Sequence, residues 1–240
     1  HQDTDMAGLT RHRHPVGGVA AAFWAAASLV AVATPALAAD RETLLWIGGA
    51  SSNTTGADGA LLGEESRSGV TAGGGFWWRF DRAIALGLDV RYTQKGSVGK
   101  VDTRFSEDAT TPGFILDATV ELNYIEVPLL LAGVLDIGAR STIRGYFGPS
   151  ANFLVGSTVK GTLNSSHFES YIGDGLKGVD WAGVVGASYA YQLASGAVVF
   201  DARWTISLRS VEDSPDLDAD VRNNTFAFAL GWAVPIRSGE

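Results

Sequence analysis

Residues 84–93 read IALGLDVRYT, and large apolar residues alternate in this stretch with small, polar or charged ones. Successive side chains of a β-strand point to opposite faces, so this alternation predicts a strand with one apolar and one polar face. Residues 198–209 (VVFDARWTISLR) and residues 225–234 (TFAFALGWAV) repeat the pattern. The repeat predicts an all-β chain.

The same alternation predicts eight strands, several of them longer than the ~5–6 residues usual in globular sheets. Their lengths match the ~9–11 residues that a tilted strand needs to cross a bilayer. We therefore predict an eight-stranded antiparallel up-and-down transmembrane β-barrel. The expected strands lie near residues 42–52, 67–78, 84–95, 119–134, 141–156, 181–193, 197–209 and 223–236.

Short and long connections alternate between these strands. The gaps at 79–83, 135–140 and 194–196 are short, and the others are long. Tight periplasmic turns and longer outer loops give this rhythm in outer-membrane barrels, and an even number of strands places both termini in the periplasm.

The apolar face of the three quoted stretches carries no charge, which lipid would require, because a charge at the bilayer midplane costs ~2–4 kcal/mol. The opposite face is mostly small, with a few acids and bases. An eight-stranded barrel is just wide enough to be filled by side chains, so we expect these groups to pair and the barrel not to conduct. The alternative is a proton or ion path. The expected interior residues are Asp89, Arg91, Glu121, Asp201 and Arg203, with Asn123 nearby.

Aromatic residues are frequent on the expected strands, and several lie near strand ends. Such residues form the interfacial girdles of membrane barrels, although ordinary core aromatics would look similar in sequence. The residues in question are Trp46, Phe76, Trp77, Trp78, Tyr92, Tyr124, Trp181, Trp204 and Trp232.

The N-terminal stretch is typical of a secretory signal peptide. Arg11 and Arg13 precede an apolar run over residues 19–33, and Ala36-Leu37-Ala38 supplies the small residues of a cleavage site. We predict a signal peptide over residues 1–38, with residues 1–5 upstream of the start at Met6, and a barrel domain over residues 39–240. A membrane-anchor helix is the alternative, but the run is short and rich in alanine.

Composition limits the other possibilities. The formal net charge is −8, and an acidic chain argues against a nucleic-acid partner. There is no Cys, so neither a disulfide framework nor a thiolate metal site is expected. Charged residues make up 18% of the chain, below the ~25% usual in soluble domains.

Three local motifs contain residue types that occur in catalytic or binding sites. His167, Glu169 and Ser170 contain base, acid and nucleophile types, but nearby loop residues seldom form a triad. Residues 173–178 match a dinucleotide fingerprint without its strand and helix context. An acidic cluster is open to weak divalent-cation or lipopolysaccharide binding, but an EF-hand is excluded. We predict no catalytic, cofactor-binding or metal-ligating residue. The acidic cluster comprises Glu212, Asp213, Asp216, Asp218 and Asp220.

The segment LNYIEVPLLL at residues 122–131, with GYFGP at 145–149 and YTQKG at 92–96, resembles the porin-family outer-membrane β-barrel proteins, also called PorT-like. The resemblance implies an outer-membrane barrel, in a family whose members mostly have no established activity and of which some are linked to secretion or surface functions. It brings no catalytic residues. Pro128 within this segment lacks an N–H donor, so we expect a bulge or register change there.

The expected function is that of a non-enzymatic barrel of the bacterial outer membrane, with a structural, adhesion or secretion-accessory role through its outer loops. Expected partners are outer-membrane lipid and lipopolysaccharide, the barrel-assembly machinery, and envelope or surface proteins. Two alternatives remain open. One is an exported soluble lipocalin-like barrel that binds a ligand inside, and the other is a lipid-modifying barrel hydrolase.

Overall fold

The computed structural model describes residues 40–55, 65–102, 115–163, 166–171, 178–209 and 222–236. All regular elements in these ranges are strands, and no helix in them is long and apolar enough to cross a membrane. The predicted signal peptide, most of the 173–178 motif and the acidic cluster at 212–220 lie outside the described residues. The strands are β1 (Asp40–Thr55), β2 (Glu65–Arg79), β3 (Ile84–Asp102), β4 (Ile115–Ile137), β5 (Ser141–Leu163), β6 (Ser166–Tyr171), β7 (Val179–Leu193), β8 (Gly196–Ser207) and β9 (Arg222–Ile236).

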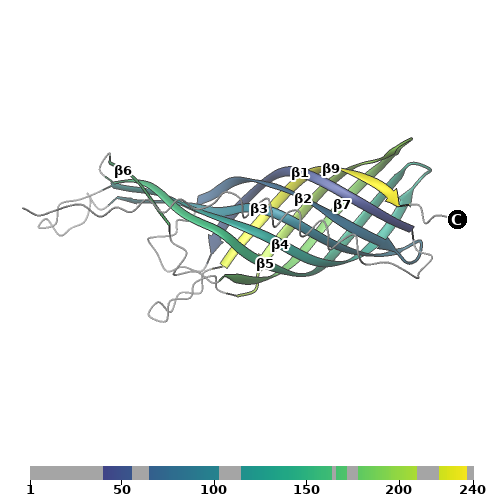
Figure 1. Cartoon of the computed structure of the whole chain (residues 1–240), viewed down its shortest axis with the longest axis horizontal. Coiled ribbons are helices and arrows are strands. Elements are labelled where there is room, and N and C mark those ends of the chain that lie inside the picture. The colour runs from purple at the N-terminus through teal and green to yellow at the C-terminus, as the bar shows by residue number, and fades with distance from the viewer. Residues whose placement is uncertain are drawn as a thin grey trace, which may run out of the picture. The chain divides into compact units, whose positions relative to one another are not determined.

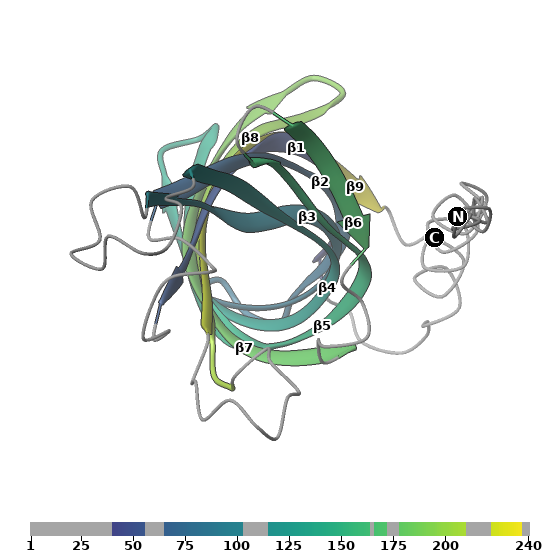
Figure 2. The same ribbon diagram turned by 90° about the vertical axis from the view of Figure 1, so that its left-hand side faces the viewer.

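Eight of these strands close into an antiparallel barrel (Figures 1 and 2). Each strand pairs with its neighbour in the chain, except that β5 is followed in the ring by β7, and β1 pairs with β9 to close it. β6 pairs with β5 alone and stands outside the ring. The predicted eight-stranded up-and-down barrel is confirmed.

The two ends of the barrel differ. The short connections 80–83, 138–140 and 194–195 lie at one end, where β1 begins beside the end of β9. We call this the short-turn end. At the other end the strands run further than the sequence predicted, with β3 reaching Asp102 and β5 reaching Leu163.

The long strands form an extension that we call the arm, made of residues 94–102, 115–123, 155–163 and β6 (Figure 1). It is a sheet in the order β3, β4, β5, β6. A bulge at Asn123/Tyr124, opposite Val155, marks where the arm leaves the barrel.

The apolar face of the barrel wall points outward. On β8 the buried residues Asp201, Arg203 and Thr205 alternate with the exposed Phe200 and Trp204. A lipocalin-like barrel would instead line its interior with the apolar residues. The orientation therefore contradicts the lipocalin alternative and agrees with an apolar outer surface that faces lipid.

Two sequence predictions about β4 are wrong. Glu121 and Asn123 do not face the interior, because Val120, Leu122 and Tyr124 occupy the buried positions of the strand, and alternation turns the residues between them outward. Pro128 causes no register change.

The pairing with β3 keeps one register on both sides of Pro128, from Leu88↔Leu129 to Arg91↔Glu126. The missing N–H of Pro128 costs one hydrogen bond of the ladder but inserts no extra residue into the strand, so no bulge forms there. The bulge lies at Asn123/Tyr124 instead.

Candidate functional site

Two reciprocal ion pairs cross the barrel interior. Arg203 contacts Asp89 at 2.5 Å, and Arg91 contacts Asp201 at 3.0 Å. Asp89 and Arg91 lie on β3 and their partners on β8. β2, β1 and β9 separate these strands on one side of the ring, and β4, β5 and β7 on the other. The pairs therefore join opposite walls, and all four side chains are buried.

Aromatic side chains complete this layer. The hydroxyl of Tyr146 on β5 donates a hydrogen bond to Asp201 at 2.5 Å, and Arg203 Nε lies 3.4 Å from the same hydroxyl. The Arg91 guanidinium lies 4.4 Å from the centroid of the Trp46 ring. Such cation–π contacts are stronger in a desolvated setting, so the layer is held by charge and ring packing together.

The predicted aromatic girdle is therefore only partly correct. Trp46, Trp77 and Tyr124 are buried inside the barrel against Arg91, Arg144 and Lys95. Buried cations in a narrow lumen are covered by aromatic faces, which explains why these rings point inward. The exposed aromatics on the outer wall include Trp181, Trp204 and Trp232.

A second buried pair lies where the arm leaves the barrel. Lys95 Nζ is 2.7 Å from Glu126, and the hydroxyl of Thr93 donates to the same carboxylate at 3.0 Å. Sequence reasoning missed Lys95 and Glu126. Lys95 continues the series Asp89, Arg91, Thr93 on one face of β3, and Glu126 shares a face with Leu122 and Tyr124, so alternation could have found both.

A third pair lies nearer the short-turn end. Glu42 on β1 pairs with Arg144 on β5, again across the ring, and Arg144 also lies 5.4 Å from the Trp77 ring centroid. The barrel interior thus contains three layers of paired charge. Within the described residues no group of His, Cys, Asp or Glu could hold a metal ion.

The arm carries its own ion network on its outward face. Glu121 contacts Arg67 at 3.0 Å and Lys160 at 3.1 Å. Glu121 belongs to the arm segment of β4 and lies outside the stretch of the strand whose outward residues are apolar. Burial raises the pKa of its carboxyl, but the hydrogen bond from Lys160 and the charge of Arg67 together outweigh burial and lower that pKa below its ordinary value.

His167 and Ser170 lie on β6 rather than in a loop, because the strands extend further than predicted. His167 Nδ1 is 3.0 Å from the hydroxyl of Thr162. Strand alternation turns His167 and Glu169 to one face and Ser170 to the other, so these three residues do not form a triad.

Comparison with known proteins identifies the family. Residues 47–213 match the family described as "Outer membrane protein beta-barrel domain". The match covers more than half of the chain, so the chain belongs to this family of bacterial outer-membrane barrels. A comparison with curated proteins found no match.

Three solved structures are similar to this chain. Ail, the attachment invasion locus protein of Yersinia pestis, in complex with the heparin analogue sucrose octasulfate, is 14% identical, with 81% of this chain and 99% of that chain covered and a TM-score of 0.39. Neisserial surface protein A is 13% identical, with 80% and 96% covered and a TM-score of 0.42. OprG from Pseudomonas aeruginosa is 12% identical, with 83% and 97% covered and a TM-score of 0.44.

Proposed function

We propose that this protein is a non-enzymatic, PorT-like barrel of the outer membrane that holds the arm at the cell surface for contact with another protein, in adhesion or as an accessory to secretion. In this proposal the short-turn end lies in the periplasm and the arm lies outside, as in other outer-membrane barrels. The filled interior supports an anchoring role rather than a transport role.

The observation that carries the proposal is the outer edge of β6. β6 pairs with β5 on one side, and among the described strands none pairs with its other side. All of its residues are exposed, including Phe168 and Tyr171. Exposed strand edges accept a strand from another chain, and proteins that avoid such pairing protect them with Lys, Pro or bulges. β6 contains no Lys or Pro, and its one carboxylate, Glu169, lies 3.9 Å from Lys160 on the neighbouring β5.

Site-specific photo-crosslinking in intact cells tests this proposal. A photoreactive residue at Phe168 or Tyr171 should capture a discrete protein partner, whereas the same residue at the lipid-facing Trp204 should not. A Glu169→Pro change on β6 removes a backbone donor and should abolish the adduct formed from position 171. Equal protein adducts from all three positions, or none from β6, would contradict the proposal.

A lipid-modifying hydrolase would need a nucleophile and a base, and His167 and Ser170 are residues of these types on β6. His167→Ala and Ser170→Ala should leave ester and lipid A hydrolysis by outer-membrane fractions unchanged. Loss of a measurable hydrolase activity in either variant would overturn the non-enzymatic assignment.

A further inference from the structure

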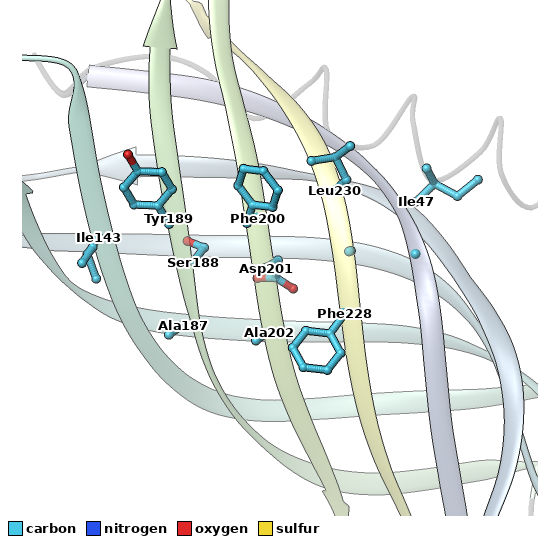
Figure 3. Close-up of a pocket in the computed structure, with 12 residues that line it drawn as sticks. Ile47, Ile143, Ala187, Ser188, Tyr189, Phe200, Asp201, Ala202, Phe228 and Leu230 are labelled. Carbon is cyan, nitrogen blue, oxygen red and sulfur yellow. The ribbon is translucent and has the colours of Figure 1, made fainter.

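The outer wall of the barrel contains a hollow of about 700 Å³ over Ala187 on β7 and Ala202 on β8 (Figure 3). These two alanines are cross-strand partners, and their small side chains leave a depression between larger ones. The large apolar side chains around it are Ile47, Ile143, Tyr189, Phe200, Phe228 and Leu230.

Residues of β5, β7, β8, β9 and β1 line the hollow itself, and a row of small residues extends it across β5 and β4. Gly145 on β5 pairs with Ala187, and Gly133 on β4 pairs with Gly145. A Cβ atom added to either glycine would meet no atom within 4 Å, so the wall is open outward at both positions. We call the depression over Gly133, Gly145, Ala187 and Ala202 the groove. With adjacent strands ~4.8 Å apart, it is ~14 Å long.

The groove is narrow and mostly apolar, with Ser188 and Asp201 as the polar residues of the hollow's lining. Val185 and Tyr189 flank Ala187 along β7, and their Cα atoms are ~13 Å apart at ~3.3 Å per residue. Their own side chains occupy much of that width, which leaves too little room for an α-helix of ~10–12 Å diameter. A flexible hydrocarbon chain is slimmer and can lie in it.

The groove slopes along the wall. Gly133 lies close to the end of β4 at Ile137, whereas Ala202 lies in the middle of β8. The groove therefore rises from near the short-turn end to the middle of the barrel. Its length is about half of the ~30 Å hydrocarbon core, which places it within one leaflet.

An exposed cation lies in a turn at the short-turn end, about five residues along β5 from Gly145. Arg140 is exposed in the turn between β4 and β5, and its carbonyl accepts a 2.7 Å hydrogen bond from the backbone N–H of Gln192 on β7. Just above it, Tyr189 bonds Ser141 at 3.0 Å, and tyrosines of this kind mark the membrane interface. Arg140 thus sits at the depth of lipid phosphates.

We propose that the groove binds one acyl chain of a phospholipid from the leaflet at the short-turn end, with the lipid phosphate against Arg140. Around an outer-membrane barrel, hydrocarbon is what meets an apolar wall, and an unfilled hollow would lose dispersion contacts. The slope leads one chain from the headgroup level into the wall, and the Arg140 guanidinium complements the anionic phosphate.

Native mass spectrometry tests the proposal on the full chain extracted from outer membranes in mild detergent. The same protein is also reconstituted in vesicles of phosphatidylglycerol and phosphatidylethanolamine. The wild type should retain one phospholipid. Gly145→Leu and Ala187→Phe fill the groove and should reduce the retained fraction about tenfold, because several methylene groups lose their contact. Val70→Phe, on the exposed outer face of β2, is the matched control and should retain the lipid.

The headgroup contact has a separate test. Arg140→Ala should weaken retention of phosphatidylglycerol but not of diacylglycerol, which lacks the phosphate. Heat-dependent gel mobility confirms that each variant is folded. Equal lipid retention by wild type and Gly145→Leu would overturn the proposal, as would a second copy of the chain or another polypeptide held at the groove. These outcomes do not depend on whether β6 binds a partner.

Discussion

The carboxylate of Asp89 and the guanidinium of Arg203 meet at 2.5 Å in the middle of the barrel, although their strands, β3 and β8, stand on opposite sides of the ring. Beside them Arg91 and Asp201 make the reciprocal contact. The layer therefore contains two charges of each sign, and it spans the lumen from wall to wall. It acts as a buried, neutral plug.

Arg203→Ala should destabilise the folded barrel by ~3–5 kcal/mol, because it leaves Asp89 and Asp201 as buried carboxylates with too few partners. The double change Asp89→Ala with Arg203→Ala should cost less than the sum of the single changes, since it removes both members of one pair. Urea unfolding in phospholipid vesicles measures these differences. Arg209→Ala, at an exposed position beyond β8, serves as the control and should cause no measurable change. Additive single and double effects would refute the coupling.

The purified wild-type protein should show no stable conductance in planar bilayers, because the paired side chains occupy the lumen. Replacing Arg91 and Arg203 by Ser together with Lys95 and Arg144, the cations of the other two layers, should permit a small cation-selective current. The carboxylates of all three layers would then remain in a vacated, hydrated space. Single-channel recording distinguishes the two proteins. Stable openings of porin size in the wild type would refute the plug.

The alternation of apolar and polar residues predicted the barrel because lipid requires apolar side chains on the outer face, while the narrow interior takes small or paired polar side chains. On β8 these requirements separate Phe200 and Trp204 from Asp201 and Arg203, so the predicted faces and the interior location of these two charges were correct. The arm was only partly predicted because its apolar residues, such as Val120, Leu122 and Val159, are too few to give a continuous alternation. Lys160, Gly161 and Thr162 give no apolar alternation, and the predicted strand therefore ended too early.

Alternation fails where apolar residues occupy both faces of a strand. On β1, Leu44 and Trp46 point inward while Leu45 and Ile47 point outward, so composition does not reveal that Trp46 covers Arg91. Which residues form ion pairs across the ring depends on how the sheet closes into a barrel and on how far the strands are shifted along one another. The pairing of Glu42 with Arg144 was therefore beyond sequence reasoning.

The arm should loosen in acid. The pKa of Glu121 is lowered in the folded protein, so its contribution to stability is present above the ordinary glutamate pKa of ~4.3 and is lost as the pH falls through the lower folded value. The protection factors of arm amides in hydrogen exchange, which compare each rate with that of an unfolded chain at the same pH, should therefore fall below about pH 4. Glu121→Gln should remove this pH dependence, while amides of β8 should show no such change. An unchanged pH profile in the Gln variant would assign the effect to another group.

The outer wall should tolerate charge only outside the bilayer. Phe228 is 61% exposed in the middle of β9, points away from the interior and packs edge-on against Phe226, so the rest of its surface should meet lipid chains. Phe228→Arg should reduce the free energy of folding into vesicles by ~2–4 kcal/mol, the depth-dependent cost of a cation near the midplane. Tyr171→Arg, at a similarly exposed position on β6, should change it little, because the arm lies in water. If both substitutions were equally harmless, the wall around Phe228 would not face the hydrocarbon, and the groove beside it would lose its proposed occupant.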